Sequence, residues 1–296
     1  MNNLKVDKLS YSYGKYKALK NISFEVTDGL VGILGPNGAG KTTAMKLITT
    51  LFKGEDGEIF LNDLSYKKDI KEVRKSIGYL PQDFSTYGNL KGREFLEIIG
   101  SLKLDCNVKK IKPHIDKIIS KLNMDEYIDK KIKQYSGGMK QKLGFAQVLI
   151  GSPSLIVVDE PTVGLDPEQR NYIRELFPII SKDRIVLVTT HIVEDIEFYC
   201  NYLLVIKDGK LIYSGTKDKF IRDVENMAWE ADVNLETYTK IVNINKILKT
   251  SQLSDSMHIQ YISSQPLTSN SKKINIDLQD AYIIHSAMEE REYKND

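Results

Sequence analysis

The sequence predicts an α/β protein that contains an inserted helical region and a small C-terminal α+β extension. A glycine-rich segment, residues 35–43, lies between a short apolar run and an amphipathic helical pattern. A second apolar run, residues 155–158, ends in two acidic residues. Between these segments, from about residue 84 to residue 150, strand patterns give way to helical ones. Buried strands that lead into polar loops and amphipathic helices are typical of α/β folds.

The N-terminal part of the chain is expected to be rich in strands. Ile22, Phe24 and Val26 alternate strictly with polar residues, as in a half-buried strand. A continuously apolar run directly precedes the glycine-rich segment, as expected of a buried central strand. The strands that these patterns predict are residues 4–13, 18–26, 30–34, 58–61 and 77–80.

The glycine-rich segment fits the phosphate-loop pattern G-x-x-x-x-G-K-[ST] at every fixed position. A triphosphate requires several backbone N–H donors aimed at one point, and glycines let the chain curl closely around it. Lys41 supplies a positive charge for the β- and γ-phosphates, and the Thr42 hydroxyl is placed to ligate Mg²⁺. The helix that follows adds its positive N-terminal end. The residues expected to bind nucleotide here are Gly35, Pro36, Asn37, Gly38, Ala39, Gly40, Lys41, Thr42 and Thr43.

Two residues outside this segment are candidates for the same site. Tyr13 precedes a turn, where its ring can stack on an adenine base, but a surface tyrosine of a β-sheet explains it equally well. Gln82 follows the strand at residues 77–80 and can hold the metal ion or orient a water molecule. An ordinary polar residue at a strand end is the competing interpretation of Gln82.

Helical patterns fill residues 84–150, which we interpret as an insert between two sheet-forming halves. Two apolar stripes at helical spacing predict helices, and Pro113 is expected to kink or separate the first turn of the second helix. The first stripe consists of Phe95, Ile98, Ile99 and Leu102, and the second lies within residues 108–122.

A third helix of the insert is expected to open at Ser136-Gly137-Gly138 and to run to about residue 150. The serine hydroxyl and the backbone N–H groups at this helix N-terminus can form a second anion site. An ordinary capped helix is the competing interpretation, and the local sequence alone favours it.

The second apolar run delivers Asp159 and Glu160 to the end of a buried strand, where open α/β sheets bind ligands. One carboxylate can hold Mg²⁺, and the next, which points the other way, can polarise an attacking water molecule. Because burying two acids is costly without such a purpose, the pair indicates a nucleotide hydrolase. A strand at residues 185–190 delivers His191 to the same edge. A lone histidine is usually structural, but here it can contact the γ-phosphate or orient Glu160.

The remaining elements complete the predicted organisation. Asp166 is expected to cap a helix that holds Pro167 in its first turn and ends early at Pro178. After about residue 219 the composition shifts towards Asn, Ser and Thr, and no catalytic constellation follows. We therefore expect a main domain at residues 1–219 and an accessory domain at residues 220–296. The further elements expected are a hairpin at residues 202–213, strands at 227–233 and 257–262, and a helix at 278–290.

The composition limits the function classes. The 296 residues are 41% hydrophobic, enough for one large core and a small second domain. A formal net charge of +2 gives no support for nucleic acid as a partner. Cys106 and Cys200 are far apart and fit a reducing compartment. No apolar run reaches the roughly 18–20 residues that span a bilayer. A cytoplasmic protein is expected, and any membrane role must come through a partner.

Taken together, these motifs resemble those of the ATP-binding cassette (ABC) ATPase family over residues 4–216. The family's signature, Leu-Ser-Gly-Gly-Gln, is changed here at Tyr135 and Met139, whereas its phosphate-contacting centre is intact. The matching motifs, in the family's order, are Tyr13, the phosphate loop, Gln82, the helical insert, the signature at 135–139, Asp159-Glu160, the D-loop at 164–166 and His191.

The resemblance implies an ABC-type phosphate-loop NTPase with a mixed core sheet, an antiparallel β subdomain and an inserted helical subdomain. It also implies that two cassettes meet head to tail around two ATP molecules. The implied roles are adenine stacking by Tyr13, nucleotide binding by residues 35–43 and Gln82, and Mg²⁺ ligation by Thr42, Gln82 and Asp159. Glu160 is implied as the general base, and the other catalytic residues implied are Lys41, which holds the phosphates, and His191, which contacts the γ-phosphate. Contact with the other cassette's ATP is implied for Ser136, Gly137 and Gly138.

The resemblance also implies partners. They are a separately encoded integral membrane permease and a second copy of this chain or another ABC ATPase, with no nucleic acid. The stretches around Gln82 and His191 resemble bacterial exporter-type cassettes, whose permeases export drugs, antimicrobial peptides or similar compounds. The chain is then expected at the cytoplasmic face of the membrane.

Two other functions compete with this one. A soluble ABC ATPase acting on translation, DNA or cluster assembly would be supported by tandem cassettes or a long coiled coil, and neither pattern occurs in the sequence. A regulatory module that binds ATP without hydrolysing it is disfavoured by Glu160.

Overall fold

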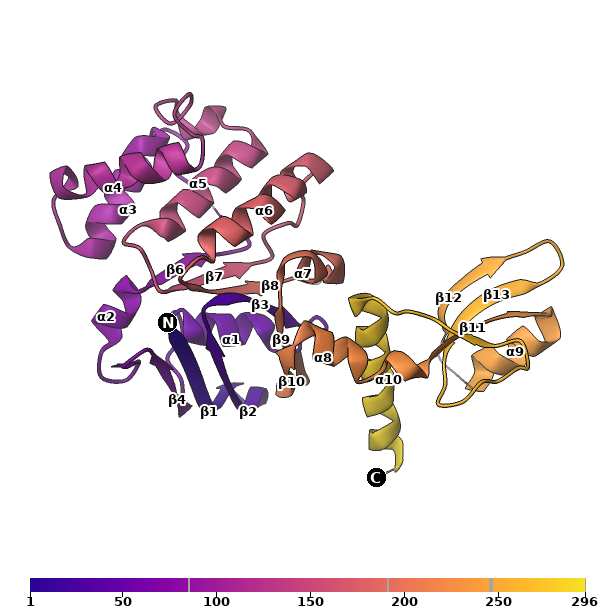
Figure 1. The fold of residues 1–296 in the computed structure, drawn as a ribbon. Coiled ribbons are helices and arrows are strands. Elements are labelled where there is room, and N and C mark those ends of the chain that lie inside the picture. Colours follow the sequence, from indigo (N-terminus) through magenta and orange to yellow (C-terminus); the bar gives the residue numbers. More distant parts are fainter. Residues whose placement is uncertain (85, 191, 245–246, 296) are drawn as a thin grey trace. The chain divides into compact units, whose positions relative to one another are not determined.

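The computed structural model describes residues 1–84, 86–190, 192–244 and 247–295. The chain divides into two compact units, Met1–Ser214 and Gly215–Asp296, and the boundary expected after residue 219 lies within the second of them. None of the helices in the described part of the chain combines the length and the apolar character that crossing a bilayer requires. Within these residues the strands form three sheets (Figure 1).

The first sheet is antiparallel and is built from the N-terminal strands in the order β2-β1-β4-β5 (Figure 1). Strand β1 pairs with β2 so that Leu4 faces Val26 and Val6 faces Phe24, and these four side chains are buried. The alternation in the sequence therefore places one apolar face of this sheet in the core. The bounds are β1 Asn3–Tyr13, β2 Tyr16–Thr27, β4 Asp56–Leu61 and β5 Leu64–Ser65.

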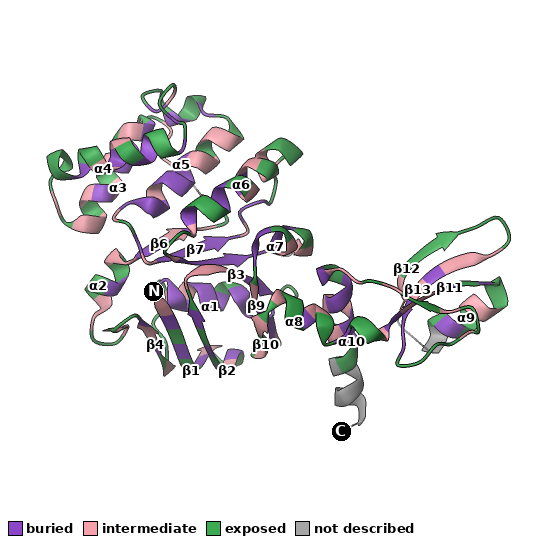
Figure 2. Ribbon diagram, viewed as in Figure 1, coloured by how far each residue is buried: buried purple, intermediate pink, exposed green. Residues whose placement is uncertain are grey.

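The second sheet has six strands in the order β10-β9-β3-β8-β7-β6, and its central neighbours run parallel. Every residue of β7 and β8 is buried, because helices and the first sheet cover the two faces (Figures 1 and 2). Because these neighbouring strands run parallel, their carboxyl ends meet at one edge of the sheet. The strands are β3 Gly29–Leu34, β6 Ile77–Leu80, β7 Leu155–Asp159, β8 Ile185–Thr189, β9 Tyr202–Lys207 and β10 Lys210–Thr216, and the helices are α1 Lys41–Ile48, α2 Ile70–Lys75, α6 Pro167–Ile180 and α7 Val193–Tyr199.

The helical insert is present, but two of the four residues in its first predicted stripe do not face the core. Ile98 is 46% exposed and Leu102 is 77% exposed, whereas the buried face of the first helix consists of Gly92, Phe95, Leu96 and Gly100. A Cβ at Gly92 would lie 2.2 Å from the Tyr135 hydroxyl, and one at Gly100 would lie 2.2 Å from the Ile111 side chain, so small residues set the packing face. The insert consists of α3 Gly92–Leu104, α4 Val108–Lys121, the 3₁₀ helix η1 Ile132–Gln134 and α5 Gly137–Leu149.

Both prolines that were expected to interrupt helices lie inside them. Helix α4 is continuous through Pro113, and α6 continues past Pro178 to Ile180. Pro178 lies in the last turn of α6, so the helix continues for only two residues beyond it. The predicted start of α6 is confirmed, because Asp166 accepts a hydrogen bond from the Gln169 N–H at 2.8 Å.

The second unit has its own small core. Its antiparallel sheet has the order β12-β13-β11-β14, and apolar side chains of β11, β13 and α9 pack together. Strands β11 and β13 and helix α10 were predicted, whereas α9 and β12 were not. Trp229 packs against this core and donates a hydrogen bond to the Ser263 carbonyl at 2.9 Å. The elements are α8 Lys217–Arg222, η2 Glu225–Met227, β11 Ala228–Val233, α9 Leu235–Ile244, β12 Ile247–Gln252, β13 Met257–Ile262, β14 Lys272–Lys273 and α10 Leu278–Asn295.

Candidate functional site

The glycine-rich loop joins the C-terminal end of β3 to the N-terminus of α1. Gly35 has a φ of 154°, and a Cβ there would lie 2.1 Å from the Ile206 carbonyl oxygen. Gly40 precedes the first helical residue with a φ of 106°, and its Cβ would lie 2.7 Å from the Ala18 carbonyl oxygen. Neighbouring strands therefore require glycine at both ends of the loop, independently of any ligand.

Lys41, the first residue of α1, lies within the curve of this loop. Its side chain is largely buried, and the Nζ donates hydrogen bonds to the carbonyl oxygens of Gly35 at 2.7 Å and Pro36 at 3.1 Å. Burial lowers the pKa of Lys41, while the charges of Glu160 and Asp159 act in the opposite direction. The loop thus holds a cationic head that two nearby carboxylates help to keep charged.

The acidic pair lies at the end of β7, beside the end of β8. Asp159 is 5% exposed and accepts a hydrogen bond from the Thr189 hydroxyl. Burial raises the pKa of Asp159, the Thr189 hydrogen bond opposes this, and the charge of Glu160 adds to it. Glu160 has a φ of 50°, and its N–H donates to the carbonyl oxygen of Thr189 at 3.0 Å. This left-handed backbone turns Glu160 out of the strand direction, at the strand end where ligands bind.

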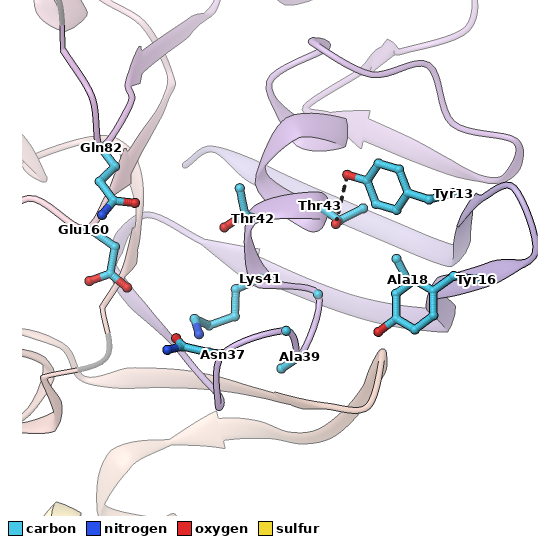
Figure 3. A pocket seen from close by; sticks show the side chains of 12 residues that line it. Tyr13, Tyr16, Ala18, Asn37, Ala39, Lys41, Thr42, Thr43, Gln82 and Glu160 are labelled. Atoms are coloured by element: carbon cyan, nitrogen blue, oxygen red, sulfur yellow. Dashed lines mark hydrogen bonds between the residues drawn. The ribbon is translucent and has the colours of Figure 1, made fainter.

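Tyr13 ends β1 on the opposite side of the loop from Glu160 (Figure 3). Its ring packs edge-on against Tyr11 at 5.1 Å and against Phe52 at 6.0 Å. Its hydroxyl lies 3.4 Å from the Thr43 hydroxyl. Tyr16, which is paired with Tyr13 across the hairpin, lies beside it and is 62% exposed.

One pocket of about 440 Å³ brings most of the predicted nucleotide residues together (Figure 3). Gln82 and Glu160 lie on one side of the loop, and Tyr13 and Tyr16 lie on the other. The sequence did not assign Tyr16 or Ala18 to this pocket, because neither residue belongs to a nucleotide-binding motif. The lining residues are Tyr13, Tyr16, Ala18, Asn37, Gly38, Ala39, Gly40, Lys41, Thr42, Thr43, Gln82 and Glu160.

The predicted second anion site lies apart from this pocket. Ser136 caps α5 and its hydroxyl accepts a hydrogen bond from the Met139 N–H at 3.3 Å. Ser136 and Gly138 line a separate pocket of about 340 Å³, together with Leu165 and Asp166 of the loop before α6. Tyr135 is buried, and its hydroxyl donates to the carbonyl oxygens of Tyr127 and Ile128, so this departure from the usual signature has a structural role inside the insert.

The other predicted residues do not line the 440 Å³ pocket or are not described. Asp159 lies beside Glu160 but does not line the 440 Å³ pocket, and neither do Gly35 and Pro36. His191 lies outside the described residues. Within the residues that the structure describes, no group of three or more His, Cys, Asp or Glu side chains could hold a metal ion. A divalent ion at Asp159 would therefore need oxygen ligands of other kinds, such as a hydroxyl, a side-chain amide, a phosphate or water.

Comparison with known proteins assigns the family. The family description "ABC transporter" matches residues 19–163. The chain is 36% identical over 213 residues to the Bacillus subtilis (strain 168) "Uncharacterized ABC transporter ATP-binding protein YxlF", with 72% of this chain and 70% of that protein covered. It is 32% identical over 216 residues to the "Linearmycin resistance ATP-binding protein LnrL" of the same organism, with 72% and 69% covered.

Among solved structures, the chain is similar to cbiO1 from Clostridium perfringens, which is described as part of the ABC transporter complex cbiONQ. The TM-score is 0.65 at 27% sequence identity, and the match covers 81% of this chain and 98% of that chain. The sequence relatives, the family match and the shared fold agree with one another. The chain therefore belongs to the ABC transporter ATP-binding proteins, the cassettes that bind and hydrolyse ATP in these transporters.

Proposed function

We propose that ATP binds in the 440 Å³ pocket with its triphosphate on residues 35–43, and that Glu160 is the general base. The observation that supports this is the convergence of the loop, Lys41, Gln82 and Glu160 on one pocket. The N–H groups of the loop and the N-terminus of α1 bind the phosphate oxygens, and Lys41 balances the charge of the β- and γ-phosphates. Glu160 orients a water molecule and accepts its proton as the water oxygen attacks the γ-phosphorus, and ADP leaves.

We infer that Mg²⁺ accompanies the nucleotide. The residues that would hold it are Thr42, Gln82 and Asp159, which supply one hydroxyl, one amide oxygen and one carboxylate. Such a set of oxygen ligands fits Mg²⁺, which is usually held by one or two carboxylates together with phosphate oxygens and water. The ion would neutralise charge on the β- and γ-phosphates. The proposed contact between His191 and the γ-phosphate rests on the family resemblance alone.

The adenine base is proposed to lie against the aromatic side of the pocket. Tyr13 and Tyr16 both line this side and come from facing positions of one hairpin. Stacking of a base on an aromatic ring contributes about 1–3 kcal/mol, so both rings would matter for affinity. A site that holds a base by ring faces, rather than by hydrogen bonds to its edge, discriminates little between different bases.

We further propose that two cassettes act together, as a homodimer or with another ABC ATPase. Ser136, Gly137 and Gly138 lie at or beside a pocket separate from the phosphate loop, so one chain does not bring both anion sites together. In a head-to-tail pair, the signature of one cassette would reach the ATP held by the other. This arrangement would use the α5 N-terminus as the second anion site.

The proposed partner is a separately encoded integral membrane permease, at the cytoplasmic face of the membrane. ABC ATPase subunits work with membrane components, and cbiO1 is described as part of a transporter complex. The name of LnrL, a linearmycin resistance protein, supports export of a drug or similar compound. No nucleic acid partner is proposed, because a formal net charge of +2 gives no support for one.

The partner proposal is tested by capture from membranes. Tagged Glu160→Gln protein, expressed in its own cell, is isolated from detergent-solubilised membranes in ATP and Mg²⁺. A polytopic membrane protein that co-purifies in stoichiometric amount supports the transporter partner. Recovery only from the soluble fraction, alone or with ribosomes, contradicts it and favours a soluble ABC ATPase.

The general-base proposal is tested by phosphate release from the purified full chain. Glu160→Gln is expected to lower kcat by a factor of at least about 100 while ATP still binds. Glu175→Gln is the matched control, because Glu175 is exposed on α6 and lines neither pocket. Undiminished hydrolysis in Glu160→Gln would exclude Glu160 as the base.

A further inference from the structure

A buried ionic cluster lies behind the segment that follows Glu160. Asp195, on α7, is fully buried, and both of its carboxylate oxygens are hydrogen-bonded. Oδ2 accepts from the Thr162 hydroxyl at 2.6 Å. Oδ1 accepts from Arg174 Nη2 at 2.6 Å and from Arg174 Nε at 3.2 Å. Thr162 is also fully buried, and the Arg174 side chain is 23% exposed.

The three residues come from three different segments. Thr162 lies in the loop between β7 and α6, Arg174 lies on α6, and Asp195 lies on α7. Breaking a buried ion pair is costly, whereas replacing the whole pair with apolar residues is often neutral. Stability alone therefore does not explain why an ion pair occupies this site. The hydrogen bond from Thr162 to Asp195 points to a second role, which is to hold the loop that contains Thr162.

The loop that contains Thr162 is held from a second side as well. The Gln141 side chain on α5 donates a hydrogen bond to the Pro161 carbonyl oxygen at 2.9 Å. Within the loop, the Val163 N–H donates to the Glu160 carbonyl oxygen at 3.4 Å, and the Leu165 N–H donates to that of Thr162 at 3.3 Å. Residues 161–165 thus connect Glu160 directly to Asp166 and contact both α5 and α7.

We propose that Asp195 is a positioning residue for ATP hydrolysis. Its carboxylate fixes Thr162, and Thr162 fixes the loop that sets the place of Glu160 at one end and of Asp166 at the other. Arg174 binds Oδ1 of this carboxylate through two N–H groups, which holds Oδ2 in place as the acceptor of the Thr162 hydrogen bond. This inference rests on the proposed role of Glu160 and extends it to the loop that follows Glu160.

The sharpest test removes only the hydroxyl of Thr162. Thr162→Val has nearly the same volume and leaves the Asp195–Arg174 pair intact, whereas Thr162→Ser keeps the hydroxyl. Thr162→Val is expected to lower kcat by about tenfold or more with the ATP dissociation constant within about twofold of wild type. Thr162→Ser is expected to retain kcat within about threefold.

A matched control separates positioning from lost stability. Thr49 is also buried, and its hydroxyl donates to the Met45 carbonyl oxygen at 2.7 Å, at the far end of α1 from the loop. Thr49→Val is expected to lower the melting temperature as Thr162→Val does, but to keep kcat. Equal kcat in Thr162→Val and wild type, or an equal loss in Thr49→Val, would overturn the inference.

A second pair of variants tests Asp195 itself. Arg174→Met combined with Asp195→Asn removes the ion pair but leaves an amide oxygen that can accept from Thr162. Arg174→Met combined with Asp195→Leu removes the acceptor too. The Asn pair is expected to retain more kcat than the Leu pair, and equal kcat values would overturn the inference.

Glu160→Gln is measured alongside to separate the two proposals. An active Glu160→Gln protein contradicts the proposed function. An inactive Glu160→Gln with a fully active Thr162→Val contradicts only the positioning role.

Discussion

At the scale of single residues, Thr189 joins the two acids of the site. Its hydroxyl donates to the Asp159 carboxylate and accepts from the Glu160 N–H at 3.2 Å. The hydrogen bond opposes the effect of burial, which raises the pKa of Asp159. The sequence did not point to Thr189, because a threonine within a buried strand is an ordinary strand residue.

Thr189→Val is expected to lower both activity and stability. The valine removes the hydrogen bond to a buried carboxylate, which should cost about 1–3 kcal/mol in the free energy of unfolding. With Asp159 held less firmly, kcat for ATP hydrolysis is expected to fall by about tenfold. Thr189→Ser, which keeps the hydroxyl, should restore most of both quantities. A Thr189→Val protein with wild-type kcat and melting temperature would contradict this role.

His114 makes stability depend on pH. Its Nε2 accepts a hydrogen bond from the Gly151 N–H at 3.1 Å, and protonation would remove this acceptor. Burial lowers the pKa of His114 below 6.5, a hydrogen bond with the Leu149 backbone opposes this, and the charges of Lys117, Lys103 and Arg184 lower it further. The unfolded chain therefore binds the proton more readily, so stability is lost as the pH falls below about 6.5.

The measurement is the melting temperature at pH 7.5 and at pH 5.5. His114→Gln offers an amide oxygen to the same N–H but does not titrate, so its melting temperature should fall less between these pH values than that of wild type. Lys117→Gln removes one neighbouring positive charge and should give an intermediate fall. If the melting temperature falls equally in wild type and in His114→Gln, this histidine does not control the loss of stability at low pH.

At the scale of elements, the N-terminus of α5 has two possible roles that one substitution can separate. Ser136 caps the helix, and the family resemblance assigns it to the other cassette's ATP. Asp is as good a cap as Ser, and its charge favours a helix N-terminus, so Ser136→Asp should keep stability within about 1 kcal/mol. Its negative charge would repel a triphosphate, so hydrolysis should fall by at least about 100-fold.

Ser136→Asn is the neutral control for this prediction. Asn caps a helix about as well as Ser, and it introduces no charge. Phosphate release and melting temperature are measured for both variants. Unchanged hydrolysis in Ser136→Asp would show that Ser136 only caps α5 and does not contact ATP.

The elements also show where sequence patterns are sufficient. The phosphate loop and the buried strands of the core sheet were predicted because their residue types are fixed by local geometry and complete burial. The packing face of α3 was not predicted, because Gly92 and Gly100 mark it by the absence of side chains. Tyr16 was also missed, since its place in the pocket depends on the pairing of β1 with β2 rather than on its neighbours in the sequence.

At the scale of the whole molecule, the sequence predicted the first unit better than the second. The second unit buries few apolar residues, and the exposed strand β12 has no clear alternation because most of its side chains face solvent. Its helix α9 follows β11 after a single residue, which leaves little room for a recognisable boundary. The pairing of β12 with β13 and the packing of α9 against the small core, rather than a local sequence pattern, therefore determine these elements.

The composition of the complete catalytic unit can be tested by mixing two inactive proteins. Lys41→Ala should disable the phosphate loop of its own chain, whereas Ser136→Asp should disable the signature that serves the other chain. In a head-to-tail homodimer, a mixed pair has one site in which both parts are intact and one in which both are disabled. Neither protein alone should release phosphate from ATP.

Mixing the two proteins in equal amounts should then restore about a quarter of the wild-type rate, since half of the pairs are mixed and each has one of two sites. The recovered rate should rise with total protein concentration, because pairing must precede hydrolysis. Mixing either variant with itself under the same conditions is the control. A mixture no more active than its components would contradict composite sites in a homodimer and favour pairing with a different ABC ATPase.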